Sequence, residues 1–171
     1  MKKISFQADV LPLKNELFRL AFRITLNRAE AEDVVQETMI KIWNRRDDWD
    51  KIDSIEAFCL TTCRNLSLDK MRRMDNQAVT LESGHDPTDN SYSSNPEEQA
   101  VQRDRVKLVR LLISRLPEKQ RTAMQLRDIE GKSYKDIANV MGITEEQVKI
   151  NIFRARQTIK KNFKHQEEYG L

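Results

Sequence analysis

Side chains suited to binding DNA gather near the C-terminus of the chain. Between Gln147 and Gln166 there are six Lys or Arg residues and no carboxylate. If this stretch is a helix, its outer face carries cationic, amide and apolar side chains, namely Gln147, Lys149, Ile150, Asn151, Phe153, Arg154 and Arg156. Such groups can bind phosphates, donate hydrogen bonds to base edges and contact thymine methyls in a major groove. The pattern predicts a DNA-recognition helix.

The residues before this stretch predict a helix-turn-helix. Ser133 and Asp136 have the spacing of an N-cap and N3 pair, and Thr144 and Gln147 repeat that spacing as a second capping box. Gly142 lies between the two predicted helices, where the chain must reverse. A surface helix whose basic residues serve only solubility is the alternative, but it leaves the exposed Ile150 and Phe153 unexplained.

Hydrophobic periodicity indicates the helices that position this face. Val148, Ile152, Ala155 and Ile159 recur at helical spacing and should pack inward. Further helices are predicted over 13–24, 29–43, 54–73, 106–116 and 117–130, with 45–53 as a charged loop around a single Trp. The stripe of the 29–43 helix is expected to bury Ala31, Val34, Val35, Thr38, Met39, Ile42 and Trp43.

The domain organisation follows from composition. Gly and Pro number only 4 each and charged helix formers are abundant, so an all-α fold is predicted. Residues 76–99 are rich in Ser, Asn, Asp and Pro, which favours a flexible acidic linker. The chain is therefore divided into two small helical domains, 1–75 and 100–171, the second ending in the helix-turn-helix. A linker of about 24 residues can extend to roughly 80 Å, so the domains can bind well-separated sites.

Charge and targeting signals narrow the class of protein. The net charge is +3, but residues 78–102 carry −5 with no Lys or Arg, so the remainder carries +8, which suits a polyanionic partner. No signal-peptide core or run of about 18 apolar residues occurs. We expect a cytoplasmic protein without membrane insertion.

The sequence offers no catalytic arrangement. Cys59 and Cys63 have no neighbouring His to complete a metal set, and His85 and His165 lack ligand-like neighbours. We expect no catalytic residues, no metal site, no cofactor and no enzymatic activity.

Three segments resemble extracytoplasmic-function (ECF) sigma factors of the sigma-70 family. They are AEDVVQETMIKIW at 31–43, SIEAFCLTTCRNLSLDKMRR at 54–73, and LPEKQRTAMQLRDIEGKSYKDIANVMGITEEQVKINIFRAR at 116–156. The resemblance covers nearly the whole chain except the predicted linker. It implies that 1–75 is sigma region 2 and 100–171 is sigma region 4, and that the protein directs core RNA polymerase to promoters.

The resemblance implies separate tasks for the two domains. Region 4 is expected to read the −35 element as duplex, and its first helices to contact the β flap of polymerase. The 30–43 helix is expected to dock on the β′ coiled coil through Asp33, Gln36, Glu37 and Ile40. By itself, that polar edge is equally typical of a solvated helix face.

Region 2 is also expected to melt and hold the −10 element. The resemblance assigns the base pocket to Asn65 and the 45–53 loop with Trp49, and the phosphate contacts to Arg64, Lys70, Arg72 and Arg73. Phe58-Cys59-Leu60 replaces the aromatic-Leu-Tyr-like run that usually begins this helix in the family. Two interpretations of Trp49 stay open, base stacking and filling of the small core.

Two alternative functions would place the protein in a different class. A stand-alone helix-turn-helix regulator would bind its operator tightly without polymerase. A site-specific recombinase would need a catalytic cluster, and the first domain has none that can be discerned.

Members of the ECF group are often restrained by an anti-sigma factor, so the resemblance also implies such a partner. The promoter sequence, the regulon, the inducing signal and the relative orientation of the domains cannot be read from the residues.

Overall fold

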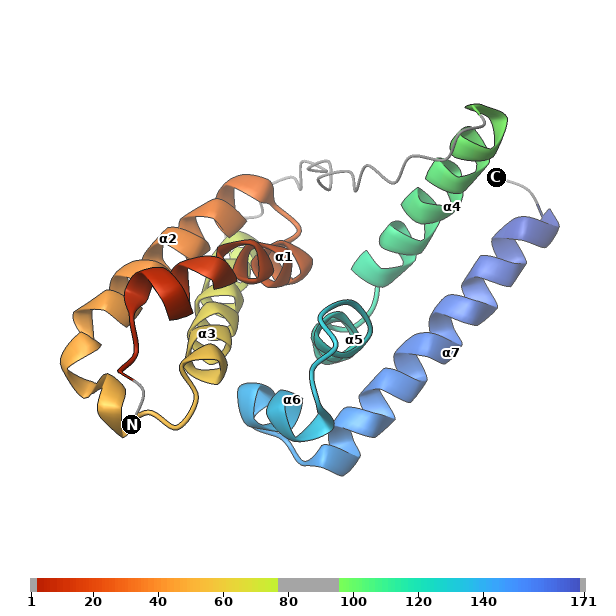
Figure 1. Cartoon of the computed structure of the whole chain (residues 1–171). Coiled ribbons are helices and arrows are strands. Elements are labelled where there is room, and N and C mark those ends of the chain that lie inside the picture. The colour runs from red at the N-terminus through yellow and green to blue at the C-terminus, as the bar shows by residue number, and fades with distance from the viewer. Residues whose placement is uncertain (1–2, 77–95, 170–171) are drawn as a thin grey trace.

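The computed structural model describes residues 3–76 and 96–169, and within these ranges the regular elements are all helices (Figure 1). The predicted all-α class is confirmed. The elements in chain order are η1 (Phe6–Val10), η2 (Leu11–Leu13), α1 (Lys14–Thr25), α2 (Arg28–Asn44), η3 (Arg46–Lys51), α3 (Ile55–Asn76), α4 (Pro96–Ser114), α5 (Glu118–Met124), η4 (Gln125–Ile129), α6 (Tyr134–Met141) and α7 (Glu145–Tyr169).

The first three α-helices pack against one another as an N-terminal domain. Leu26 adopts a left-handed conformation with φ 57° and ends α1, and Asn27 Oδ1 then accepts from Glu30 N at 3.0 Å to begin α2. Ser54 Oγ accepts from Ala57 N at 3.1 Å, as expected of the N-cap of α3. These caps fix where each helix starts, and therefore which faces meet in the core.

Two expectations about the aromatic residues of this domain require correction. The charged segment around Trp49 is not a loop but the 3-10 helix η3, and it buries the indole to 7% exposure. Trp49 Nε1 donates to Ile42 O at 3.0 Å, which satisfies the only donor of the buried ring. Trp43, expected in the buried stripe of α2, is instead 47% exposed. Trp49, and not Trp43, therefore fills the core at the end of α2.

The C-terminal domain contains α4 to α7. Helix α4 begins at Pro96, within the segment expected to be linker, and residues 77–95 lie outside the described part of the chain. Helix α5 continues as the wider turn η4 and ends before Gly131, which has φ 69°. The predicted helix-turn-helix is formed by α6 and α7, with Gly142 at φ 66° between them.

The capping boxes of the helix-turn-helix form as predicted. Ser133 Oγ accepts from Asp136 N at 3.1 Å. Thr144 and Gln147 exchange reciprocal bonds, with Gln147 N donating to Thr144 Oγ1 at 3.1 Å and Thr144 N donating to Gln147 Oε1 at 3.0 Å. The start of α7 is therefore held by two side chains that also lie at the edge of its exposed face.

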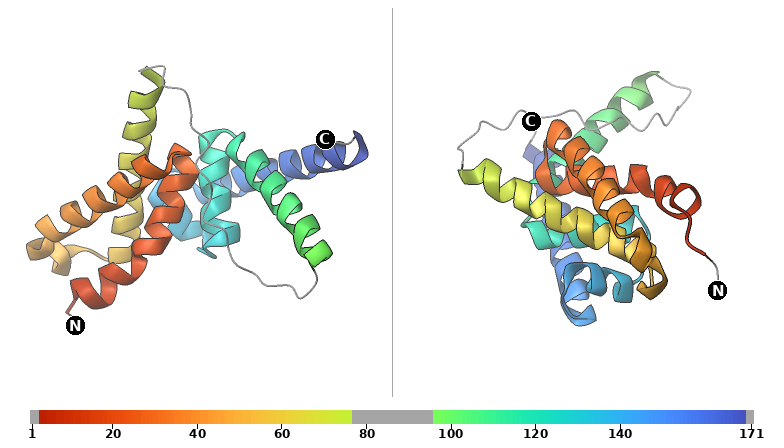
Figure 2. Two further views of the ribbon diagram at one scale, coloured as in Figure 1. Left: turned by 90° about the horizontal axis from the view of Figure 1, so that it is seen from above. Right: turned by 90° about the vertical axis from the view of Figure 1, so that its left-hand side faces the viewer.

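The two domains share one apolar core. Helix α1 packs on α5 and α3 packs on α6, and both views in Figure 2 show these helices side by side. Buried residues of the N-terminal domain such as Leu17 and Cys63 belong to the same cluster as Leu126, Ile137 and Met141 of the C-terminal domain. The two predicted domains therefore pack against each other through this shared core.

Charged and polar side chains surround this shared core. Arg64 donates to both carboxylate oxygens of Glu118 at 3.3 Å and to Met141 O at 3.4 Å, and Arg121 Nη2 donates to Ile24 O at 3.0 Å. Arg19 binds Glu130 through two bonds of 2.6 and 2.9 Å. Bidentate Arg–carboxylate pairs are directional, so they fix the orientation of one domain on the other.

The ion pairs of Lys132 allow a test of whether charged contacts keep the two domains packed together. Its Nζ lies 2.8 Å from Glu16 Oε1 and also binds Glu56, so it joins α1 and α3 to the segment before α6, and its side chain is only 17% exposed. In Lys132→Glu, three carboxylates meet at the interface. Loss of a poorly solvated ion pair costs about 3–5 kcal/mol, so we expect the domains to separate.

Small-angle X-ray scattering should then report a larger radius of gyration for Lys132→Glu than for the wild type. The matched control is Lys135→Glu, which makes the same charge change at an exposed position three residues away. Equal radii for the two variants would show that the Lys132 ion pairs do not hold the domains together.

Candidate DNA and polymerase interfaces

The predicted recognition face of α7 is accessible. Val148, Ile152 and Ala155 are at most 2% exposed and pack inward, as the periodicity predicts. On the opposite side, Ile150 is 47% exposed and Phe153 is 60% exposed, although both are large apolar side chains. Gln147, Lys149, Arg154 and Arg156 are also exposed, whereas Asn151 is half-buried because its amide donates to Gln147 O at 2.8 Å.

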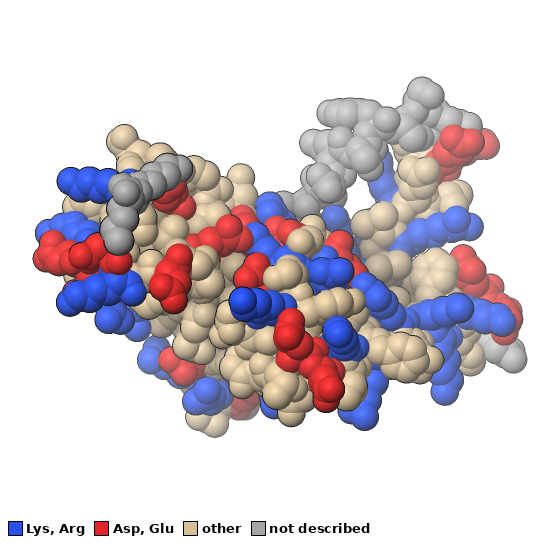
Figure 3. All heavy atoms as spheres, turned by 60° about the horizontal axis from the view of Figure 1, so that its bottom comes forward, with Lys and Arg blue, Asp and Glu red and all other residues tan. Residues whose placement is uncertain are grey.

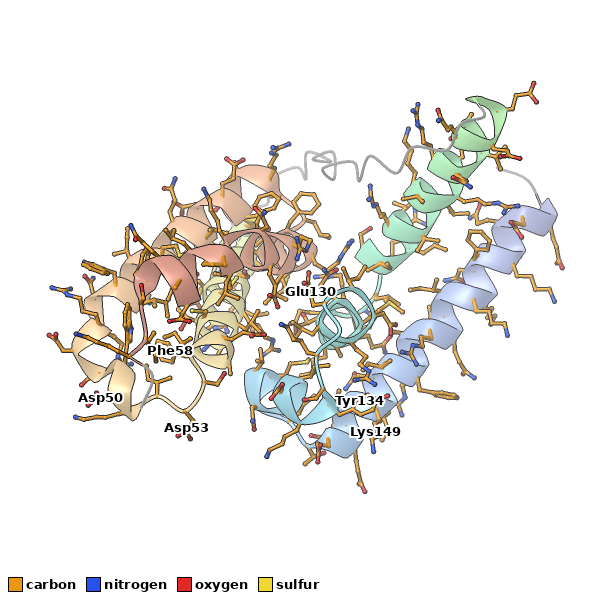
Figure 4. The ribbon with its side chains drawn as sticks, viewed as in Figure 1. Asp50, Asp53, Phe58, Glu130, Tyr134 and Lys149 are labelled. Atoms are coloured by element: carbon orange, nitrogen blue, oxygen red, sulfur yellow. The ribbon has the colours of Figure 1, made fainter. Side chains whose placement is uncertain are left out.

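The basic side chains of this face are held by neighbouring elements. Lys149 Nζ lies 5.3 Å and Arg127 Cζ 4.2 Å from the centroid of the Tyr134 ring, and Figure 4 shows Tyr134 and Lys149 together at the tip of the helix-turn-helix. Arg156 forms a bidentate pair with Asp128, with Nε donating to Oδ2 at 3.0 Å. That hydrogen bond raises the pKa of the Arg156 guanidinium. Arg156 must therefore exchange Asp128 for a phosphate if it binds DNA.

Some of the residues expected to bind the −10 element are exposed to solvent, and others are hydrogen-bonded within the protein. Asn65, Arg72 and Arg73 are exposed on α3. Arg64 is 8% exposed, because it points to the other side of α3 and binds Glu118 and Met141 O across the domain interface. Sequence reasoning placed Arg64 beside its neighbours in the chain, but one residue along a helix turns the side chain by about 100°. In the closed arrangement Arg64 is therefore engaged by the C-terminal domain.

The surface at the end of α2 presents Trp43, and not Trp49 as expected. Trp49 lies in the core, whereas Trp43 is exposed and contacts the rings of Phe6 and Trp49 edge-on, with centroid separations of 5.4 and 6.4 Å. Arg46 lies over the Trp43 ring at 4.6 Å. Arg45 Cζ lies 5.4 Å from the ring centroid of the half-buried Phe58, in the first turn of α3. Sequence reasoning missed Trp43 because helical periodicity assigned it to the buried stripe.

The predicted docking face of α2 is a mixed polar and apolar surface. Gln36 and Ile40 are exposed, with Ile40 at 59%, while Asp33 and Glu37 are half-buried. Positions 33, 36, 37 and 40 follow the spacing of one helix face. This face therefore presents one exposed apolar side chain beside two acids.

Lys70 brings two predicted sites together. Its Nζ hydrogen-bonds to Asp33 and lies 3.5 Å from Glu30 Oε2 and 3.7 Å from Glu37 Oε1. The hydrogen bond from Lys70 lowers the pKa of Asp33 below 3.8, and the same bond raises the pKa of Lys70 above 10.5. A residue assigned to DNA phosphates is therefore paired with residues assigned to the polymerase.

A groove of about 1180 Å³ lies between the domains, lined by α1 and α2 on one side and α4 and α7 on the other. Its lining includes the apolar side chains of Phe18, Phe22, Val106 and Ile113 and exposed arginines such as Arg28 and Arg105. Sequence reasoning could not find this groove, because it exists only where the two domains pack together.

Acidic and basic side chains are mixed on the face of the molecule that Figure 3 shows, with Lys and Arg interspersed with Asp and Glu. Burial raises the pKa of the Cys59 and Cys63 thiols to about 12, so neither is a reactive thiolate. In ranges 3–76 and 96–169, no group of three His, Cys, Asp or Glu residues could hold a metal ion. No helix in those ranges is long and apolar enough to cross a membrane.

Family models match both halves of the chain. A model described as sigma-70 region 2 matches residues 10–77, and one described as sigma-70, region 4 matches residues 107–159. The RNA polymerase sigma-H factor of Pseudomonas aeruginosa is 34% identical over 166 residues, covering 93% of this chain and 86% of that relative. The ECF RNA polymerase sigma factor SigW of Bacillus subtilis is 26% identical, covering 92% and 88%.

Solved structures resemble the whole fold. The sigma factor RpoE from Bartonella quintana, in complex with the anti-sigma factor NepR, aligns with a TM-score of 0.75 over 93% of this chain and 96% of its own, at 24% identity. CnrH, in complex with the cytosolic domain of CnrY, aligns with a TM-score of 0.67 at 21% identity, covering 94% and 88%. At these identities the likeness shows the fold.

The Lys70–Asp33 bond predicts a measurable titration. In Lys70→Gln the pKa of Asp33 should rise toward 3.8, because the bond and the charge that lower it are lost, whereas Lys70→Arg should keep it low. Because the folded-state pKa is depressed, the stability that this pair contributes is present at neutral pH and is lost as the pH falls below 3.8. Carbon-detected NMR titration of the Asp33 carboxyl measures the shift, and an unchanged pKa in Lys70→Gln would contradict the pairing.

Proposed function

Since the chain belongs to the ECF group of the sigma-70 family of RNA polymerase sigma factors, we propose that its two domains contact separate promoter elements and a single core polymerase. A sigma factor binds core RNA polymerase and directs promoter-specific transcription initiation, and this chain has that function. A stand-alone regulator is not favoured, because both sigma regions are matched. We assign region 2 to residues 1–75 and region 4 to 100–171, with the segment 76–99 between them.

The observation that carries the proposal is the outward face of α7. Two apolar side chains, Ile150 and Phe153, are left exposed between Gln147, Lys149 and Arg154 on a helix fixed by a capping box. We propose that this face enters the major groove of the −35 element, and that Asn151 and Arg156 join it when their internal bonds are exchanged. We further propose that α4 and α5 contact the β flap of polymerase.

For the −10 element, we propose that Asn65, Arg72 and Arg73 provide the strand-binding surface of α3. Trp49 supports this surface from the core and does not stack on a base, since its ring is buried and its only donor is bonded to Ile42 O. Trp43, exposed beside Arg46, is better placed to meet an unstacked base.

Simultaneous reading of both elements requires the domains to separate. The −35 and −10 elements lie about 25 base pairs apart, or roughly 85 Å of duplex at 3.4 Å per base pair. In the closed body α3 packs on α6 and α6 on α7, so α3 and the start of α7 are only about 20 Å apart. We therefore propose that the closed form is not engaged with a promoter, and that Arg64 becomes available to DNA when the domains part.

We propose that α2 docks on the β′ coiled coil through Asp33, Gln36, Glu37 and Ile40. The apolar Ile40, at 59% exposure, supplies an anchor, and the two acids supply charge complementary to a basic partner surface.

We also propose an anti-sigma factor as a partner, and place an amphipathic helix of that factor in the interdomain groove. The apolar side chains of Phe18 and Phe22 fit the apolar face of such a helix, and Arg28 and Arg105 fit acidic side chains along its edges. Because both domains line the groove, an occupant would favour the closed form.

We propose that the protein acts in the cytoplasm, where core polymerase meets the chromosome, and that it has no enzymatic activity of its own.

Run-off transcription with purified core polymerase and a genomic promoter library tests the function. The wild type should initiate at specific promoters, and the Asp33→Arg, Glu37→Arg variant should lose at least about 30-fold of this activity. The reason is that reversing charges in an interface costs 2 kcal/mol or more.

Glu168→Arg, which reverses an exposed charge at the end of α7 and outside α2, is the control and should retain initiation. Thermal unfolding followed by circular dichroism verifies that each variant is folded. If the wild type initiates at no promoter, the sigma function is wrong. If the double variant initiates as well as the wild type, the docking face alone is wrong.

The −35 assignment predicts a loss of affinity for duplex DNA. Lys149→Ala and Arg154→Ala should each weaken binding by about 1–3 kcal/mol if they read bases, and should relax the preference at one position of the element. Lys164→Ala, exposed near the far end of α7, should have little effect. Competition with single-base variants of the element distinguishes base contacts from phosphate contacts. Loss of a phosphate contact weakens binding to all sequences equally and lowers the salt slope by about 1.

A further inference from the structure

Arg121 is a buried cation that joins the two domains, and it is only 6% exposed. Its Nη1 donates to Ser114 O at 3.2 Å and to Leu116 O at 3.0 Å, both in its own domain. Its Nη2 donates across the interface to Ile24 O at 3.0 Å and to Met71 Sδ at 3.8 Å. One guanidinium group therefore holds the end of α1 and the second half of α3 against α5.

The hydrogen-bond partners of this cation are weak for its charge. Among the described residues they are three carbonyl oxygens and one thioether sulfur, and the buried Nε of Arg121 has no hydrogen-bond partner. Burial lowers the pKa of the Arg121 guanidinium, because its charged form is poorly solvated there. A thioether sulfur is a weak acceptor, whereas a guanidinium forms strong hydrogen bonds with good oxygen acceptors. The Met71 sulfur is thus the weakest of the four contacts.

Oxidation would convert this weak acceptor into a strong one. Met71 is partly exposed, so a small oxidant reaches its sulfur. Hydrogen peroxide transfers one oxygen atom to a thioether: the S–O bond forms as the O–O bond breaks, the sulfur is oxidised by two electrons, and the second peroxide oxygen leaves as water. A Met side chain has three rotatable bonds, so either sulfoxide epimer can turn its oxygen toward the guanidinium.

The surroundings of Met71 reverse the usual effect of such a change. A sulfoxide in an apolar core is disruptive, because it places a polar group where nothing binds it. The Met71 sulfur instead faces a buried cation whose other acceptors are neutral carbonyls. Met74 lies one turn further along α3 and is also partly exposed, so it provides an internal comparison.

We propose that Met71 is an oxidation site through which peroxide tightens the closed form: its sulfoxide oxygen accepts from Arg121 and strengthens the contact between α3 and α5. Methionine sulfoxide reductases reverse the modification. The consequence for transcription rests on the proposed function, in which the domains separate to engage a promoter. The oxidised protein then initiates less until the sulfoxide is reduced.

Single-molecule fluorescence transfer measures the ratio of closed to open molecules of the full chain. Dyes are attached at Asp53→Cys and Lys164→Cys, two exposed positions in different domains. The native Cys59 and Cys63 do not compete for the dyes, since both are buried and burial raises their thiol pKa to about 12. Urea is added in small steps until open molecules are counted.

A sulfoxide mimic tests the acceptor without any oxidant. In Met71→Gln the side-chain carbonyl carbon takes the place of the sulfur, so its oxygen occupies the position of the sulfoxide oxygen. The variant should raise the ratio of closed to open molecules about fivefold or more, the effect of replacing a weak acceptor by a strong one beside a charged donor. Met74→Gln, the matched control, should leave the ratio unchanged or lower it. An unchanged or lower ratio in Met71→Gln would overturn the inference.

Two double variants of equal composition test the oxidation itself. Met39→Leu, Met74→Leu retains Met71, and Met39→Leu, Met71→Leu retains Met74, while every other methionine is common to both. Both are treated with hydrogen peroxide, and peptide mass spectrometry locates the sulfoxides. The variant with Met71 should shift toward the closed form and return after treatment with methionine sulfoxide reductase, and the other should not. An equal shift in both variants, or resistance of Met71 to oxidation, would show that it is not the site.

Run-off transcription separates this inference from the proposed function. Met71→Gln and the oxidised variant that retains Met71 should initiate less than the wild type and the reduced variant. If the closed form is favoured but initiation is unchanged, the oxidation site stands and the proposed need for domain separation is wrong. If neither change favours the closed form, the oxidation site is wrong whatever the level of initiation.

Discussion

The packing of α1 and α3 against α5 and α6 is the constraint on which the rest of the structure depends. Leu17 and Cys63 share one core with Leu126, Ile137 and Met141, so the two domains bury apolar surface against each other. Burial of this kind is non-directional. The bidentate Arg19–Glu130 pair and the bonds of Arg64 therefore decide the orientation in which the domains close.

Closure has consequences for the charged residues of a DNA-binding protein. Arg64, Arg156 and Lys70 were all expected to face phosphates, and each is bound instead to a carboxylate of its own chain. Moving these charges to DNA exchanges one anionic partner for another, so the net gain is smaller than the contact alone suggests. If these residues bind promoter DNA as proposed, that binding has to compete with the internal pairs.

Local patterns predicted the elements well because the interactions that form them are local. The Thr144–Gln147 capping box, the Ser133 cap and the turn at Gly142 appear as expected, since each requires residues only a few positions apart. Filling of the core by Trp49 was one of the two interpretations left open, and its buried indole supports it, whereas the exposure of Trp43 was not predicted. Trp43 has the helical spacing of the buried stripe of α2, and its exposure depends on how η3 packs against the end of that helix.

The sequence by itself determined the all-α class, the outward-facing side of α7 and the resemblance to a sigma factor, because periodicity, caps and motif spacing are written in neighbouring residues. Only the tertiary structure decided that the domains share a core, that Lys70 binds acids of α2 and that a groove lies between α1 and α4. These features join residues tens of positions apart. Their geometry follows from how whole helices pack, and no local pattern encodes it.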